Sequence, residues 1–204
     1  MSGARTPRTP PDEARERIVR VVIELLRTDG YDSVGLRQVA RRAHVSLARI
    51  YDQFGSRDEL IVAAMLRWMD EHAYATLNLP PALGVYEGLM HVFRAVFEPW
   101  ERNPLMLEAF HRARIGPAGQ ALARQGADAL SPIIGAVLAD TDPAYARDVE
   151  LVLANLFYAV FGRFADGELA IADLLPILER TAFRLTADNT RAVRRLTTAT
   201  HQRT

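Results

Sequence analysis

Apolar residues recur along the chain at the three- and four-residue spacing of amphipathic helices. The first stripe puts five of them on one helical face: Ile18, Val21, Val22, Leu25 and Leu26. Gly30 follows this stripe and is expected to end the helix. Residues 2–11 are rich in proline, threonine and serine, which predicts a flexible arm over residues 1–11 and a helix from about Asp12.

Three more helical stretches follow, and the first two are joined by a very short turn. The first two stretches cover Leu36–Ala43 and Ser46–Phe54, with the turn at Ala43–Val45. Two helices joined so tightly must cross steeply, which is the geometry of a helix-turn-helix whose second helix is exposed to the DNA major groove. We therefore predict this motif at about residues 34–53, inside an N-terminal domain of residues 12–60.

A longer helical pattern starts at Ser56 and is ended by the prolines at 80 and 81, which predicts a connecting helix over residues 56–79. No stretch alternates like a β-strand, so we predict an all-α fold with a helical second domain over residues 80–190. Residues 191–204 form a basic C-terminal tail. The helices expected in the second domain, separated by proline and glycine signals, are 83–99, 104–114, 118–139, 143–165 and 168–187.

Composition excludes several functional classes. The chain has no cysteine, and its five histidines show no paired spacing, so we expect no metal site. No nucleophile–base pair, carboxylate pair or glycine-rich phosphate loop is evident, so we expect no catalytic residues, no cofactor and no enzyme. There is no apolar run of about 18 residues and no signal-peptide pattern at the N-terminus, which favours a cytoplasmic protein without a membrane partner.

Charge alone does not favour a nucleic-acid partner. All 25 basic residues are arginines, and 25 acidic residues balance them to a net charge of zero. Residues 1–60 carry 11 arginines and 9 acids, residues 61–190 carry 10 and 16, and residues 191–204 carry 4 and none. Any DNA contact must therefore come from the local placement of arginines and helix N-termini.

The run GYDSVGLRQVARRAHVSLARIYDQFGSRDEL, residues 30–60, resembles the signature of the TetR family of bacterial transcription regulators. The shared features are a Gly-aromatic pair, an LxxVA helix, a VS turn, an IYxxF recognition helix and a following S-R-x-E-L segment. The chain has Leu47, Asp52 and Gly55 where the family usually has lysine, histidine and proline. A second segment, ERNPLMLEAFHRA at residues 101–113, is similar to actinobacterial repressors of sterol and fatty-acid catabolism.

The resemblance implies a three-helix helix-turn-helix domain that binds DNA and a helical bundle that binds a ligand and dimerises. In the first, Ser46 can cap the recognition helix and Arg49 can reach a guanine edge, while Arg57 is placed for a phosphate. Asp52 is expected to pair with a neighbouring arginine such as Arg49. Each residue also has an ordinary interpretation as a cap or a solvated side chain. The candidate DNA-binding residues are Arg37, Gln38, Ser46, Leu47, Ala48, Arg49, Tyr51, Gln53 and Arg57.

A cavity between the helices of the second domain is also implied by the resemblance. Bulky apolar residues gather in this domain, and we expect about half of them to contact an elongated apolar effector, lipid-, sterol- or acyl-like. Among the polar residues near them, His91, Arg112 and Tyr158 could orient a carboxylate, ketone or thioester. The candidate ligand-binding residues are Trp68, Met90, Phe93, Phe97, Trp100, Met106, Phe110, His111, Phe157, Tyr158 and Phe161.

The last two predicted helices, joined by a tight Asp-Gly turn, form an antiparallel hairpin with more apolar surface than two helices can hide from each other. A four-helix interface across a two-fold axis would bury the remainder. The candidate dimer-interface residues are Leu153, Leu156, Val160, Phe164, Leu174 and Leu178.

Together these observations predict a homodimeric repressor that binds a palindromic operator and leaves it when a small hydrophobic molecule binds. An alternative is a helical carrier or interaction module in which the DNA-reading motif is vestigial, which Leu47 and Asp52 keep open. The sequence does not distinguish a repressor from an activator, and it does not identify the operator or the effector.

Overall fold

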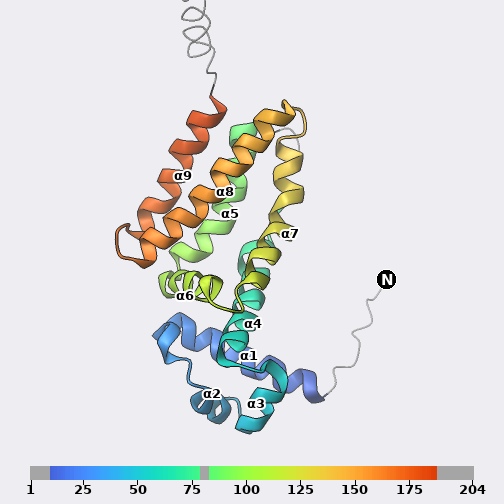
Figure 1. Cartoon of the computed structure of the whole chain (residues 1–204), viewed down its shortest axis with the longest axis vertical. Helices are drawn as coiled ribbons and strands as arrows, with labels where there is room; N and C mark the ends of the chain where they lie inside the picture. The colour runs from blue at the N-terminus through green and yellow to red at the C-terminus, as the bar shows by residue number, and fades with distance from the viewer. Residues whose placement is uncertain (1–9, 79–82, 188–204) are drawn as a thin grey trace, which may run out of the picture.

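The N-terminal part of the chain folds into a small helical unit. The computed structural model describes residues 10–78 and 83–187, and over these residues it contains helices and no β-strand, which confirms the all-α fold (Figure 1). The unit consists of α1 (Pro10–Asp29), a 3-10 turn η1 (Tyr31–Ser33), α2 (Leu36–Arg42), α3 (Leu47–Phe54) and the start of α4 (Arg57–Met69).

The first helix begins two residues earlier than predicted, at Pro10. Proline is tolerated there because the first helical N–H groups have no partner within the helix. The rest of the predicted arm and the basic tail, residues 191–204, lie outside the described residues. The apolar stripe of α1 packs inward as expected, with Ile18, Leu25 and Leu26 fully buried.

The turn between α2 and α3 depends on a left-handed residue. His44 has a φ of 53°, and the N–H of Val45 donates a 3.0 Å hydrogen bond to the carbonyl of Ala40, which closes the end of α2. Histidine is one of the few non-glycine residues enriched in this conformation. The chain therefore reverses within one turn, and α3 crosses α2 as a helix-turn-helix requires.

A second left-handed residue ends α3. Gly55 has a φ of 71° and donates its N–H to the carbonyl of Tyr51 at 2.9 Å. Proline, the usual residue of the family here, is locked near a φ of about −65° and does not fit this turn. Ser56 then caps α4 by accepting a 3.1 Å hydrogen bond from the N–H of Glu59.

The connecting helix changes its winding before it ends. The α-helical part stops at Met69, and residues Asp70–Tyr74, labelled η2, are π-helical instead of the continuous helix predicted to residue 79. Two backbone carbonyls just before this segment have side-chain neighbours at hydrogen-bond distance. Gln125 donates its Nε2 to the carbonyl of Leu66 at 2.8 Å, and Nδ1 of His72 lies 3.0 Å from the carbonyl oxygen of Trp68.

The second unit is a bundle in which α8 and α9 run antiparallel side by side, with α5 behind them and α7 packed on α5 (Figure 1). The short helix α6 lies across the lower end of this bundle and packs on α1 and α4. Proline and glycine signals placed these helices within a few residues. Their bounds are α5 Val85–Glu101, α6 Pro104–Ile115, α7 Gln120–Val137, α8 Pro143–Ala165 and α9 Ile171–Thr186.

None of the helices in the described ranges is both long and apolar enough to span a membrane. The same part of the chain contains no cluster of three or more histidines or acidic residues that could hold a metal ion.

Candidate DNA-binding surface and ligand cavity

The N-terminal turn of α3 is the exposed end of the helix-turn-helix. Ser46 caps it, because its hydroxyl accepts a 3.1 Å hydrogen bond from the N–H of Arg49. Ala48 is exposed, and Leu47 and Arg49 are half-buried. One turn further, Tyr51 keeps half of its surface exposed. The inner side of the helix is fixed by Ile50 and Phe54, which are buried in the core. The predicted base-reading residues therefore share the outward side of α3.

Arginines dominate the exposed surface of α2. Residues 36–54 contain four arginines and one aspartate. Arg37 is exposed, and Arg41 and Arg42, which were not among the predicted contacts, are exposed on the same helix. Asp52 is exposed and forms no ion pair with Arg49 or any other described residue, so the expected pairing was wrong.

Helix α1 fixes the far end of α3. Arg15 donates a 3.2 Å hydrogen bond to the backbone carbonyl of Gln53, and its guanidinium lies 4.4 Å from the ring centre of Phe54. These contacts join the last turn of α3 to a long helix. The recognition helix is therefore held by the protein at its C-terminal end and presented at its N-terminal end.

The predicted phosphate ligand Arg57 is engaged by the protein itself. Its Nε donates to the carbonyl of Val34 at 2.8 Å and its Nη2 to the carbonyl of Tyr31 at 2.6 Å. The guanidinium also lies 4.7 Å from the ring centre of Tyr31. The Nε–H, the Nη2–H and one face of the guanidinium thus hold the segment between α1 and α2, and this geometry gives no support to a phosphate contact.

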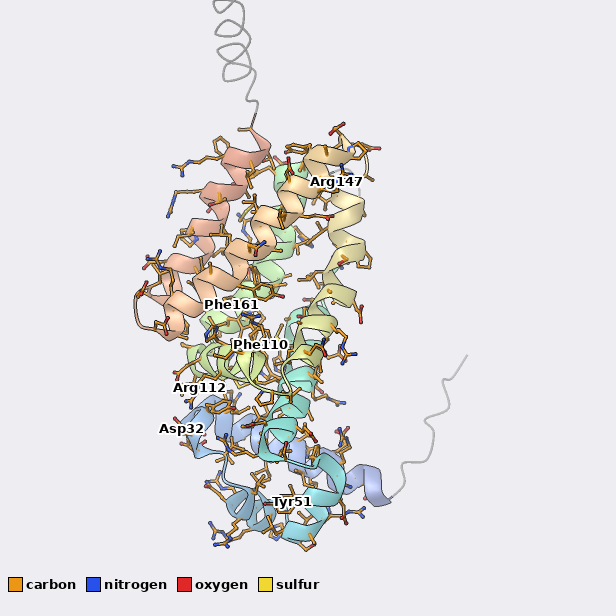
Figure 2. The ribbon with its side chains drawn as sticks, viewed as in Figure 1. Asp32, Tyr51, Phe110, Arg112, Arg147 and Phe161 are labelled. Atoms are coloured by element: carbon orange, nitrogen blue, oxygen red, sulfur yellow. The ribbon has the colours of Figure 1, made fainter. Side chains whose placement is uncertain are left out.

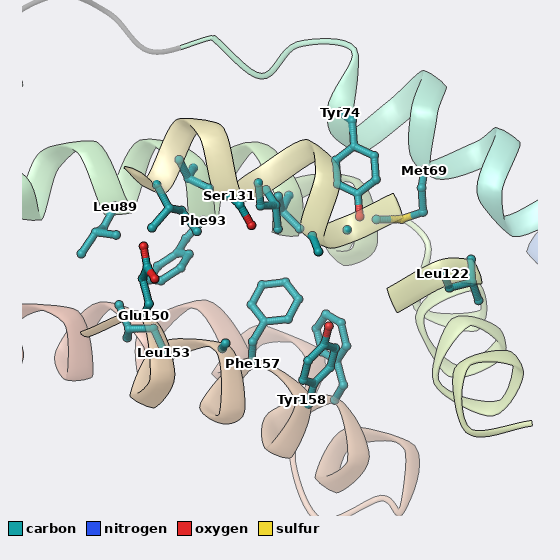
Figure 3. Close-up of a pocket in the computed structure, with 18 of the residues that line it drawn as sticks. Met69, Tyr74, Leu89, Phe93, Leu122, Ser131, Glu150, Leu153, Phe157 and Tyr158 are labelled. Atoms are coloured by element: carbon teal, nitrogen blue, oxygen red, sulfur yellow. The ribbon is translucent and has the colours of Figure 1, made fainter. Parts of the chain in front are cut away.

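A cavity of about 290 Å³ lies inside the second unit, between α5, α7 and α8 and next to the end of α4 (Figure 3). Its wall is mostly apolar. Met69, Tyr74 and Leu122 lie at one end, and Leu89 and Glu150 lie at the other (Figure 3). Because Leu89 and Trp100 both line the cavity and are eleven residues apart on α5, its length is roughly 16 Å.

About half of the predicted ligand-binding residues line this cavity. The six that do are Phe93, Trp100, Phe110, Phe157, Tyr158 and Phe161. The five that do not are Trp68, Met90, Phe97, Met106 and His111. Four of these five are core residues, at most 2% exposed, that face other helices. Helical periodicity identifies residues that point inward, but it does not distinguish a cavity wall from a helix–helix contact.

Four polar side chains of the cavity come from three helical segments: Tyr74 from η2, Ser131 from α7, and both Glu150 and Tyr158 from α8. Tyr74, Ser131 and Glu150 were not predicted, and Tyr158 was (Figure 3). Burial raises the pKa of Tyr74 far above its ordinary value, with smaller contributions from Tyr158 and Asp70, so its hydroxyl stays protonated. The buried indole N–H of Trp100 has no hydrogen-bond acceptor among the described residues.

Helix α6 connects the cavity to the N-terminal unit. Phe110 lines the cavity, and two residues later Arg112 donates hydrogen bonds of 2.8 Å to both carboxylate oxygens of Asp32 in η1 (Figure 2). The Arg112 guanidinium also lies 4.2 Å from the ring centre of Tyr31. The hydrogen bond from Arg112 lowers the pKa of Asp32, and the same bond raises the pKa of Arg112.

His111, between these two residues, is half-buried, and its Nδ1 has no hydrogen-bond partner in the described part of the chain. Burial lowers its pKa, and the charge of Arg114 lowers it further, while Asp166 acts in the opposite direction. His111 thus belongs to the packing between α6 and α8 and does not reach the cavity.

The predicted dimer-interface residues face their own chain. Leu153, Val160, Leu174 and Leu178 are between 0% and 5% exposed within the single chain, and Leu156 and Phe164 pack partly buried against the same core. The prediction treated the α8–α9 hairpin as packed only on itself, whereas α9 also packs on α5 and α8 on α6. The outward apolar residues of the hairpin are instead Leu151, Val152 and Phe183.

Family comparisons match both units. The model described as "Bacterial regulatory proteins, tetR family" matches residues 18–64, and "Tetracyclin repressor-like, C-terminal domain" matches residues 84–185. The HTH-type transcriptional repressor KstR of Rhodococcus jostii (strain RHA1) is 26% identical over 182 residues, which cover 88% of this chain and 85% of that protein.

Other relatives match over shorter lengths. KstR of Mycolicibacterium smegmatis is 32% identical over 102 residues, half of each chain, and the HTH-type transcriptional regulator AlkX of Mycobacterium tuberculosis is 30% identical over 96 residues, 46% of this chain and 45% of that protein. These names describe transcription regulators and not enzymes. A crystal structure of a TetR transcriptional regulator from Rhodococcus sp. RHA1 has the same fold, with a TM-score of 0.66 and 20% identity over 86% of this chain and 96% of that one.

Proposed function

Because the chain belongs to the TetR family of DNA-binding transcriptional regulators, we propose that it is a repressor that binds a palindromic operator as a homodimer and is released by a small apolar effector. The observation that carries this proposal is the position of α6. One short helix contributes Phe110 to the cavity wall and Arg112 to a bidentate contact with the helix-turn-helix unit.

The DNA side of the proposal rests on the exposed turn of α3. Arg49 is proposed to contact a base edge, with Leu47 and Ala48 beside it in the major groove. Tyr51 and the arginines of α2, Arg37 and Arg41, are proposed to contact the backbone. The capped N-terminus of α3 adds backbone N–H groups for a phosphate.

Dimerisation is proposed through the outward face of α8. One recognition helix per chain supplies too little contact for operator-grade affinity, so two must be held about 34–36 Å apart. Leu151 is 64% exposed and Val152 is 42% exposed, side by side on α8. An exposed apolar pair on a long helix is the kind of surface that a second copy of the chain would cover.

The effector is proposed to occupy the cavity between α5, α7 and α8. A largely apolar wall favours an apolar body. The indole N–H of Trp100 is a buried donor that has no acceptor within residues 10–78 and 83–187, and an acceptor atom on a ligand would satisfy it.

Release is proposed to follow movement of α6. An occupant that displaces Phe110 would shift α6, and Arg112 is only two residues away, so the contact with Asp32 would move with it. The two recognition helices would then lose their match to successive major grooves, and the effector would favour the state that does not bind DNA.

A gel shift with the promoter of the protein's own gene tests the proposal. Binding should be salt-dependent and should require both halves of a palindrome. Native mass spectrometry can identify a ligand that co-purifies with the protein. Adding that ligand to the protein–DNA complex should then release the DNA. Absence of binding to that promoter at low salt would favour the alternative of a carrier with a vestigial motif.

A further inference from the structure

Among the described residues, a single one carries the charge of the cavity wall. Its other lining residues are apolar or neutral polar side chains, and among the 21 residues that line it there is no arginine or histidine. Glu150 is the one ionisable carboxylate. Any charged group on a ligand would therefore meet a negative charge and no positive one.

Glu150 is exposed, so it stands where the cavity meets solvent. Figure 3 shows its carboxylate directed toward the cavity beside Leu89 and Phe93, at the end opposite Met69 and Tyr74. The carboxylate has no ion pair and no hydrogen bond with any described residue. An unpaired carboxylate at the end of an apolar cavity is available to a ligand's polar head.

The arginine that packs against a wall residue does not itself line the cavity. Arg114 on α6 stacks over the ring of Tyr158 at 4.1 Å, but Arg114 does not line the cavity. Tyr158 itself is a neutral neighbour for a ligand, as are Ser131 and Tyr74, whose hydroxyls can donate or accept hydrogen bonds.

We propose that this cavity selects elongated apolar molecules whose polar head is neutral or cationic and donates a hydrogen bond to Glu150, and that it discriminates against anionic acyl chains. The proposal rests on the proposed effector cavity and adds the chemical class of its ligand. Two like charges about 4 Å apart repel by about 1 kcal/mol even in bulk water, and more strongly near a low-dielectric wall. A carboxylate head should therefore bind about fivefold or more weakly than a hydroxyl head on the same chain.

Three probes of equal chain length isolate the head group: decanol, decylamine and decanoate. Their binding to the full chain is measured by isothermal titration and by tryptophan fluorescence, to which Trp100 in the cavity wall contributes. We expect decanol and decylamine to bind at least about fivefold more tightly than decanoate. In Glu150→Gln the disadvantage of decanoate should disappear, and decylamine should lose affinity.

Asp148→Asn is the matched control. It removes the same charge from the same helix at an exposed position outside the cavity wall, so it should leave the order of the three probes unchanged. Equal binding of decanol and decanoate by the natural chain, or an unchanged preference in Glu150→Gln, would overturn the inference while leaving operator binding, measured separately by gel shift without probe, intact. Absence of binding by all three probes would overturn both the inference and the effector cavity.

Discussion

Arg112 on α6 and Asp32 on η1 are 80 residues apart in sequence, and they form a bidentate pair whose two hydrogen bonds are each 2.8 Å long. Because Asp32 has a lowered pKa in the folded chain, the pair is complete above the ordinary aspartate pKa and is lost only as the pH falls through the lowered value. At neutral pH the two units are therefore held together by a full charge pair.

Breaking this pair should reduce the effect of a cavity occupant on the affinity for operator DNA. In Asp32→Ala, we expect the ratio of operator affinities with and without a cavity occupant such as decanol to move toward one, because α6 no longer pulls on η1. Fluorescence anisotropy with labelled operator measures the ratio. Glu168→Ala, which removes an exposed ion pair with Arg163 in the α8–α9 turn, is the control and should keep the natural ratio. A natural response in Asp32→Ala would remove the pair from the release mechanism.

Arg57 should contribute to stability and not to the salt dependence of DNA binding. Arg57→Ala removes the guanidinium donor from the carbonyls of Tyr31 and Val34, so urea unfolding should show a loss of about 1–3 kcal/mol. Arg41→Ala, an exposed arginine of α2, should change stability by less than about 0.5 kcal/mol and make the salt slope shallower by about one unit. The reverse pattern would restore Arg57 as a phosphate ligand.

Arg49 should specify a base pair. Arg49→Ala is expected to weaken operator binding by about 1–3 kcal/mol and to relax the preference at one position, as a base-edge contact would. Binding measured on a set of single-base operator variants gives both quantities. Tyr51→Phe is the comparison, since loss of a backbone contact lowers affinity on all variants alike. A uniform loss in Arg49→Ala would reassign this residue to phosphate.

Dimer formation should depend on the outward side of α8. Leu151→Glu should produce a monomer in analytical ultracentrifugation and abolish operator binding, with the thermal stability of the fold unchanged. Ile115→Glu is a matched control, because Ile115 on α6 is 65% exposed against 64% for Leu151. Leu178→Glu differs from both, since Leu178 is fully buried and a charge there should unfold the chain. A Leu151→Glu dimer would contradict the assignment.

His111 should make stability fall at mildly acidic pH. Its pKa is lowered in the folded chain, so the unfolded chain binds the proton more readily. The contribution of His111 to the free energy of unfolding is therefore complete above about pH 6.5 and is lost as the pH falls below this value. Urea unfolding at about pH 7.5 and 5.5 should show a smaller difference in His111→Gln than in the natural chain. His44→Asn, at an exposed left-handed position, should retain the natural difference.

Local signals in the sequence located the helices well. Pro104 and Pro143 each begin a helix as predicted, and Ser46 caps α3. These features depend on residues within one turn of each other, which is the distance over which proline, glycine and caps act.

Contacts between residues far apart in the chain could not be predicted from the sequence. The pairing of Arg112 with Asp32 depends on how α6 docks on η1, and no local pattern encodes it. Phe97 and Phe157 looked equivalent as inward aromatic residues, but only Phe157 lines the cavity. Glu150 was missed because a single acid on a helix is ordinarily a solvated residue, and only the cavity beside it gives it another role.

The π-helical segment Asp70–Tyr74 determines which residue of the chain faces the cavity at one end. A π turn holds one residue more than the α turn it replaces. Since each residue rotates an α-helix by about 100°, a chain without the extra residue would present a different side chain where Tyr74 stands. Gain or loss of a single residue here would re-line this end of the cavity while α4 and the DNA-binding unit stayed as they are, so effector preference can diverge among relatives without any change in how they hold DNA.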